Sequence, residues 1–373
     1  MKSVAPEINL PLTDNVAESF TLPSEYYLSE DVYELEKENI FYRTWQYVAH
    51  ISMLTEVGDY VSLKICDQNI FVILTDEGSI KGFYNVCQHR AHELVEGAGN
   101  VNGVIVCPYH AWTYKTDGSL LAARMGSKRP DFDKCRFSLK EINVEIFCGC
   151  VFVNLDADAQ RLNDIAGDLA NDIRARTPYL DDLELCGTDM FGETVNKAGW
   201  KVVVDNFLEC YHCAPAHPDF ASLIDMSAYQ VDAFKYWSRQ IGHKIRNENT
   251  AYHVDPDEGN QCSVAWFLWP NTTFNILPGS REFSVFAVRP LGLDTCSFEG
   301  HSMAPEGIMN QERADYTSNI LVPEDIGLCE SVQRGLKSKG YDQGPFIYDA
   351  QREGISEHGL HHFHRLVQQA LTS

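Results

Sequence analysis

The stretches CQH at residues 87–89 and CPYH at residues 107–110 decide how the first half of this chain is expected to fold. Each stretch supplies one Cys and one His, which gives the set Cys87, His89, Cys107 and His110. Such a thiolate and imidazole set is typical of the higher-potential class of [2Fe–2S] cluster, in which two His replace two Cys on one iron. We therefore expect a site that stores an electron.

Zinc is the alternative for the same four residues. Structural zinc sites usually pair Cys with Cys and His with His along the chain, whereas here each stretch contains one of each. The segments at 82–86 and 101–106 resemble strands and lead directly into the two stretches. This arrangement favours a cluster held between two loops over a zinc site.

Composition restricts the partners and the compartment. The chain carries 53 acidic and 30 basic residues, and this excess of negative charge argues against a nucleic-acid partner, because phosphate binding depends on Lys and Arg. No apolar run is long enough to span a membrane, and residues 1–10 lack the pattern of a signal peptide. We therefore expect a cytoplasmic protein whose 12 cysteines form no disulfides.

Three regions with different patterns predict an α+β fold in two domains. Residues 1–45 form a polar arm and a helix from Ser29, expected to pack on the C-terminal domain. Residues 46–157 predict a small all-β domain, and residues 158–373 a larger domain with an antiparallel sheet covered by helices. No G-x-G-x-x-G motif follows a strand, so electrons would come from another protein.

A second group of metal-binding residue types lies in the stretch DNFLECYHCAPAH at residues 205–217. On an ideal helix His212 and His217 would lie about 140° apart, so they could share one metal only if the helix breaks between them. We expect Pro215 to cause that break. Two His and one carboxylate form the facial triad of non-haem Fe(II), although two buried structural histidines are the alternative.

Asp325 is the candidate for the third ligand because of helical periodicity. In a helix that begins near Pro323, Asp325 lies at the centre of an apolar stripe made by Leu328, Cys329, Val332 and Leu336. Its neighbour Glu324 is rotated by about 100° and is expected to face solvent or cap the helix. The alternative is that Asp325 binds no metal and is only an acidic residue in the first turn, where a negative charge stabilises the helix N-terminus.

Four further histidines lie near the C-terminus at helical spacing with apolar residues: His358, His361, His362 and His364. They predict a packing or surface helix rather than a metal site.

The stretches CQHRAHE (87–93) and CPYHAWTYKTDG (107–118) resemble the Rieske motif of the Rieske non-haem iron oxygenase alpha subunits. The resemblance implies a helix-grip-like catalytic domain in which His212, His217 and Asp325 hold one mononuclear Fe(II). It also implies that Glu209 matches the acid that links this iron to the cluster. Most of the family has Asp there, and commonly Gly where this chain has Ala111.

The same resemblance implies partners. The family's members are homotrimers in which the cluster of one subunit lies beside the iron of the next, so a neighbour's His110 would face Glu209. A separate flavin and iron–sulfur reductase would supply electrons originating from NAD(P)H.

Segments at 205–220, 330–341 and 354–359 are most similar to the branch that acts on quaternary ammonium compounds such as carnitine, glycine betaine and choline. This implies a monooxygenase that hydroxylates a C–H bond next to the nitrogen and so breaks a C–N bond. There are two alternatives. The chain could be a Rieske oxygenase that acts on an unrelated aromatic or small molecule, or a Rieske-type electron carrier that catalyses no reaction of its own.

A trimethylammonium group would be held by aromatic faces. The candidates are Tyr211, Trp266, Phe267, Trp269, Phe274, Phe283 and Phe286. For a substrate carboxylate the sequence does not choose among Arg281, Arg289, Asn271 and Asn275.

Overall fold

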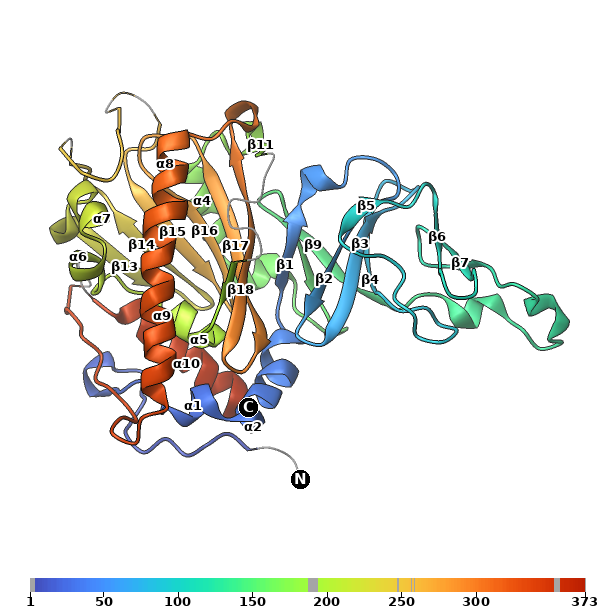
Figure 1. Cartoon of the computed structure of the whole chain (residues 1–373), viewed down its shortest axis with the longest axis horizontal. Helices are drawn as coiled ribbons and strands as arrows, with labels where there is room; N and C mark the ends of the chain where they lie inside the picture. Colours follow the sequence, from blue (N-terminus) through green and yellow to red (C-terminus); the bar gives the residue numbers. More distant parts are fainter. Residues whose placement is uncertain are drawn as a thin grey trace. The chain divides into compact units, whose positions relative to one another are not determined.

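The computed structural model describes residues 4–186, 194–246, 248–255, 257, 259–351 and 356–372. The chain divides into two compact units, residues 41–164 and residues 1–40 with 165–373 (Figure 1). The expected combination of a small all-β part and a larger part with an antiparallel sheet and helices is confirmed. Among the described residues, no helix is both long and apolar enough to cross a membrane.

The unit at 41–164 is built from two antiparallel sheets. The larger sheet has the order β1-β10-β9-β4-β3-β2-β5, and β6, β7 and β8 form the smaller one. The strands are β1 (Gln46–His50), β2 (Asp59–Ile65), β3 (Gln68–Leu74), β4 (Ile80–Tyr84), β5 (Ala98–Asn100), β6 (Val104–Val106), β7 (Thr113–Lys115), β8 (Leu120–Ala122), β9 (Glu141–Phe147) and β10 (Cys150–Asn154). Phe71, Phe83 and Tyr114 are fully buried and pack with Cys87 and Cys107 in one core.

The other unit contains one antiparallel sheet in the order β11-β18-β17-β16-β15-β14-β13, with β12 also paired to β18. The strands are β11 (Glu184–Leu185), β12 (Thr194–Asn196), β13 (Tyr229–Ala233), β14 (Trp237–Gly242), β15 (Ser263–Leu268), β16 (Thr272–Ile276), β17 (Phe283–Gly292) and β18 (Thr295–Ala304). Figure 1 shows α8 and α9 running across this sheet, and α5 packs against both α9 and β17. These helices and the sheet enclose the candidate site.

The helices are α1 (Glu25–Leu28), α2 (Glu30–Glu36), α3 (Leu162–Ala166), α4 (Leu169–Arg176), α5 (Trp200–Phe207), α6 (Cys213–Ala216), α7 (Pro218–Leu223), α8 (Gln311–Tyr316), α9 (Val322–Leu336) and α10 (His358–Thr372). As its position predicted, Ser29 caps α2 by accepting a hydrogen bond from the N–H of Val32. Five-residue π-helical segments follow α2 at Lys37–Phe41 and join α8 to α9 at Thr317–Leu321.

Candidate functional site

Two similar loops present the Cys and His pairs of the first site. The first follows β4, and there the N–H of Cys87 donates to the carbonyl of His92 at 2.8 Å. The second follows β6, and there the N–H of Cys107 donates to the carbonyl of Trp112, also at 2.8 Å. These hydrogen bonds fold each loop back on itself, so its Cys and His can face the same point.

The four side chains are arranged as a metal-binding set requires. Cys87 and Cys107 are each 2% exposed, and neither forms a disulfide. The rings of His89 and His110 lie 4.6 Å apart between centroids. Nδ1 of His110 is buried and has no hydrogen-bond partner among the described residues, which is unfavourable unless a metal binds it. The set therefore fits a [2Fe–2S] cluster.

His212, His217 and Asp325 form the second site. One ligand atom from each lies within 4.8 Å of the others, although α9 supplies Asp325 from more than 100 positions along the chain. Oδ1 of Asp325 lies 2.9 Å from Nε2 of His217 and 3.6 Å from Nε2 of His212. Two imidazoles and one carboxylate at these distances fit a single Fe(II) with open positions.

In both His212 and His217, the ring nitrogen that faces away from the metal position, Nδ1, contacts a carboxylate. Glu209 contacts Nδ1 of His212, and Oε2 of Glu324 lies 2.8 Å from Nδ1 of His217. The expectation that Glu324 faces solvent or caps the helix was wrong. Glu324 precedes Asp325 on α9, and its side chain, one methylene longer than that of Asp, contacts His217. Both imidazoles are thereby oriented with Nε2 toward the metal position.

The prediction that Leu328, Cys329, Val332 and Leu336 form a buried stripe on α9 was correct for only two of the four residues. Cys329 and Leu336 are buried, but Leu328 is 36% and Val332 is 51% exposed. Only one edge of the helix packs against the protein, and Asp325 lies on that edge facing the two histidines.

The electrostatics of the triad favour a bound cation. Burial lowers the pKa of His212, but its hydrogen bonds to Asp325 and Glu209 outweigh burial and raise the pKa to about 9. Burial would raise the pKa of Asp325, yet hydrogen bonds to the two histidines hold it below its usual value. The metal-free site therefore prefers an ionised Asp325 beside a protonated His212, and a metal ion would replace that proton.

The chain breaks at His217, not at Pro215 as expected. Pro215 lies in the first turn of α6, where its missing N–H breaks no helical hydrogen bond. His217 has φ −121° and ψ 67°, outside the helical region, and Pro218 begins α7. Because a residue before proline avoids the α conformation, Pro218 accounts for the break that turns His217 toward His212.

Cys210 and Cys213 form a disulfide, which contradicts the expectation of none. The two residues are three positions apart on either side of His212 and both are buried. Helix α5 ends at Phe207, and the turn that follows it allows the two sulfurs to meet.

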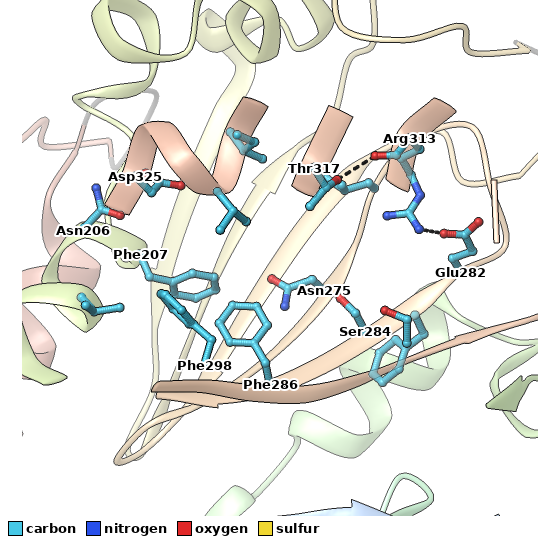
Figure 2. Close-up of a pocket in the computed structure, with 16 residues that line it drawn as sticks. Asn206, Phe207, Asn275, Glu282, Ser284, Phe286, Phe298, Arg313, Thr317 and Asp325 are labelled. Atoms are coloured by element: carbon cyan, nitrogen blue, oxygen red, sulfur yellow. Dashed lines mark hydrogen bonds and ion pairs between the residues drawn. The ribbon is translucent and has the colours of Figure 1, made fainter. Parts of the chain in front are cut away.

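A cavity of about 180 Å³ begins at Asp325 and runs between the helices and the sheet (Figure 2). Asp325 lies at one end of the row of lining residues in Figure 2, and Arg313 with Glu282 at the other. The lining residues are Val203, Asn206, Phe207, Asn275, Leu277, Glu282, Phe283, Ser284, Phe286, Phe298, Ser302, Arg313, Thr317, Leu321, Val322 and Asp325.

Of the aromatic substrate candidates, Phe283 and Phe286 line this cavity. The other candidates, Tyr211, Trp266, Phe267, Trp269 and Phe274, are not among the lining residues.

Four of these aromatic residues are instead buried elsewhere in the unit. The indole of Trp266 donates to Asp172, and Phe274 is its partner on β16, so strand alternation turns both away from the cavity. Phe267 and Trp269 each pack against Phe363 of α10, at 5.8 Å between centroids.

Tyr211 lies in the turn before α6 and is 47% exposed. Its N–H group donates to Glu209, which fixes its backbone rather than its ring.

Among the carboxylate-binding candidates, only Asn275 lines the cavity. Arg289 pairs with Glu299, and the amide of Asn271 donates to the carbonyl of Val288. Sequence reasoning missed Arg313. The sequence carried no signal for it, because Arg313 and Asp325 reach the same cavity only through the π-helical segment Thr317–Leu321.

Two family models match the chain. "Rieske [2Fe-2S] domain" matches residues 44–133, and "Ring hydroxylating alpha subunit (catalytic domain)" matches residues 192–373. The first range contains all four predicted cluster ligands, and the second contains the His212, His217 and Asp325 triad.

Curated and structural relatives extend this similarity over nearly the whole chain. The carnitine monooxygenase oxygenase subunit of Acinetobacter pittii is 39% identical over 94% of this chain and 95% of its own length. A solved quaternary ammonium Rieske monooxygenase in complex with L-carnitine is 38% identical, with a TM-score of 0.86 over 95% of this chain and 97% of that one. A complex with γ-butyrobetaine has a TM-score of 0.86 at 37% identity, over 98% and 99% of the two chains.

Proposed function

This chain belongs to the Rieske non-haem iron oxygenases, as an oxygenase alpha subunit, and we propose that its substrate is a methylated ammonium compound similar to carnitine or a betaine. The reaction is a monooxygenation of a C–H bond next to the cationic nitrogen. The resulting carbinol is unstable and loses either trimethylamine or formaldehyde, depending on the carbon attacked. The observation that supports this proposal most is the aromatic cavity that begins at Asp325.

Members of this family carry a Rieske [2Fe–2S] cluster and one mononuclear iron. We assign the cluster to Cys87, His89, Cys107 and His110, and the iron to His212, His217 and Asp325. When bound, the iron activates O₂ and the cluster supplies electrons to it.

The protein's own side chains position the substrate and limit water. Phe207, Phe286 and Phe298 form a wall beside the triad, with centroids 5.8 Å apart for both Phe207–Phe286 and Phe286–Phe298. Aromatic faces attract a trimethylammonium group, which offers no hydrogen-bond donor. The same wall makes the cavity apolar beside Asp325, and Glu209 and Glu324 keep both imidazoles oriented through their Nδ1 atoms.

We also assign two kinds of protein partner. A separate flavin and iron–sulfur reductase would deliver electrons, and the chain would work as a homotrimer in which the cluster of one subunit serves the iron of the next. In that assembly Glu209 would connect His212 to His110 of the neighbouring subunit.

Iron analysis and a substrate panel test the function. We expect three irons per chain, a Rieske-type EPR signal after reduction, and O₂ uptake with carnitine, γ-butyrobetaine, glycine betaine or choline when a surrogate reductase is present. Trimethylamine or formaldehyde should appear in proportion to O₂ consumed.

Other results would favour the alternatives. Two irons per chain without O₂ uptake would indicate an electron carrier. O₂ uptake with an aromatic hydrocarbon but none of the four ammonium compounds would contradict the substrate class.

A further inference from the structure

Arg313 and Glu282 form a buried ion pair at the end of the cavity opposite Asp325 (Figure 2). Glu282 and Arg313 are each 5% exposed. The carboxylate of Glu282 accepts the N–H of Asn310 through Oε1 and contacts Arg313 Nη2 through Oε2. Nε of Arg313 is buried and has no hydrogen-bond partner among the described residues. One donor of a desolvated guanidinium is therefore available to a ligand.

Two rows of residues run from the triad to this ion pair. On the helix side, Asp325, Leu321, Thr317 and Arg313 all line the cavity at four-residue spacing. In an uninterrupted α-helix, 12 positions would leave Arg313 and Asp325 about 120° apart. The π-helical segment Thr317–Leu321 has a wider turn that takes up part of this difference, so both ends face the cavity.

On the sheet side, the row is Phe286, Ser284 and Glu282. Alternate residues of a strand share a face, and these three lie on the cavity side of β17 and the residue before it. Asn275 is paired with Ser284 on the neighbouring strand and also lines the cavity. The cavity is thus aromatic near Asp325 and polar near Arg313.

We propose that Arg313 binds the carboxylate of a zwitterionic substrate whose trimethylammonium group lies against the Phe207, Phe286 and Phe298 wall. This inference rests on the proposed function and specifies its substrate class: ω-trimethylammonio carboxylates, with several carbons between the two charges. Ser284 and Asn275 offer further donors beside Arg313. The opposite orientation would place the substrate carboxylate against the Phe207, Phe286 and Phe298 wall, which offers it no hydrogen-bond donor.

The orientation has a chemical consequence. With the carboxylate at Arg313, the carbons bonded to nitrogen lie at the end of the cavity nearest His212, His217 and Asp325. Those carbons carry the C–H bonds that the proposed reaction attacks. Choline has no carboxylate, so Arg313 gives it no advantage over other cations.

Comparing γ-butyrobetaine with its methyl ester isolates the carboxylate. We expect Arg313→Gln to lower kcat/KM for the acid about 10–100-fold, the usual effect of losing one hydrogen bond to a charged group. For the ester, which is cationic but carries no anion, the change should stay below about threefold. Arg313→Lys should recover part of the loss for the acid, because it restores the positive charge without the planar geometry of Arg.

Glu282→Gln is the matched control on the other side of the ion pair. It keeps Arg313 and removes the competing anion, so the preference for acid over ester should be maintained or increased. If Arg313→Gln does not fold because Glu282 is left buried without its partner, the double variant E282Q/R313Q replaces it and should show the same selective loss.

Two results would overturn the inference. One is an equal loss for acid and ester in the Arg313 variants, which indicates a structural role. The other is an equally efficient oxidation of acid and ester by the unmodified protein. If the unmodified protein, loaded with cluster and iron, oxidises none of the methylammonium compounds, the proposed function itself is wrong, and this outcome is separate from the first two.

Discussion

At the residue scale, the contact between Glu324 and His217 is the feature that sequence periodicity described incorrectly. Periodicity gives the direction of a side chain from its helix axis but not its reach, and Glu is one methylene longer than Asp. The structure places Oε2 of Glu324 2.8 Å from Nδ1 of His217. A ligand histidine held in this way presents one nitrogen to the metal in a fixed direction.

We expect Glu324→Ala to weaken iron binding about 10–100-fold, because His217 loses the partner that orients it. Glu324→Gln keeps an oxygen acceptor for His217, so its iron affinity should fall much less than that of the Ala variant. Competition with a calibrated chelator measures both, and the cluster's visible spectrum reports that the rest of the protein is intact. Equal iron affinity in the Ala variant and the unmodified protein would contradict this role.

Glu209 holds the imidazole of His212, and we propose that it links this ligand to the cluster of a neighbouring subunit. It contacts Nδ1 of His212 and accepts the N–H groups of Tyr211 and His212. We expect Glu209→Ala to keep the cluster spectrum but to abolish turnover, even in samples reloaded with iron. Re-oxidation of the reduced cluster by O₂ and substrate, followed by stopped-flow absorbance, should slow by a similar factor, whereas substantial activity would exclude the bridging role.

Ala111 has φ 57°, a left-handed conformation that a Cβ disfavours. By the resemblance described above, the family commonly has Gly at this position, and Gly adopts a positive φ without strain. Ala111→Gly should stabilise the unit at 41–164 by about 0.5–1 kcal/mol, because relief of that strain exceeds the entropy cost of Gly. Thermal unfolding, followed by the loss of the cluster's visible absorbance, measures this change in stability. Ala122→Gly, in strand β8, is the control, and it should lower the stability of the same unit.

At the scale of elements, short-range sequence signals predicted where the ligands lie better than how the chain turns between them. A strand before each of Cys87 and Cys107 and a helix carrying Asp325 were expected and are present, although β4 ends at Tyr84, three residues before Cys87. The end of α5 at Phe207 and the Cys210–Cys213 disulfide were not expected, because sequence spacing alone does not show where a helix ends or which cysteines pair.

The aromatic candidates show the same limit of sequence reasoning. β15 carries Trp266 and Phe267 and β16 carries Phe274, and composition alone cannot say which face of the sheet each ring occupies. Phe207 and Phe298 line the cavity but come from other elements, so only the assembled fold brings them to it.

Helix α10 carries the four C-terminal histidines, and it packs against the N-terminal arm. His361 is 7% exposed, and its Nε2–H donates to the carbonyl of Thr13 at 2.9 Å. Burial lowers the pKa of His361 to about 4, and the charges of nearby His364, Arg365 and His358 act in the same direction. The folded state therefore keeps this imidazole neutral.

This shift predicts that the arm becomes less stable in acid. A depressed His pKa means that the unfolded state binds the proton more tightly, so stability is fully present above pH 6.5 and is lost as the pH falls toward 4. The loss should reach about 3 kcal/mol at most. Hydrogen exchange of the amides around Thr13 and Ser19 should accelerate over this pH range, and His361→Gln, which keeps an N–H donor, should remove most of the pH dependence. An unchanged profile in that variant would assign the acid sensitivity to other groups.

At the scale of the whole molecule, the proposed trimer predicts that two inactive variants can restore each other. Cys107→Ser should abolish the cluster and leave the iron site, whereas Asp325→Ala should abolish the iron site and leave the cluster. In a ring assembled at random from equal amounts of both, a working cluster precedes a working iron at about one interface in four. Electron transfer between subunits therefore predicts about 25% of the unmodified activity for co-expressed variants.

The controls separate this result from transfer within one chain. Each variant expressed alone should be inactive, and preformed trimers mixed after purification should stay inactive unless subunits exchange. If electrons pass from cluster to iron inside the same subunit, the co-expressed mixture has no complete path and no activity. A mixture with different affinity tags on the two variants, purified through both, should have higher activity than the unselected mixture, because trimers of one type are removed. Activity that does not rise with this selection would contradict the proposed arrangement, even if some activity is present in the mixture.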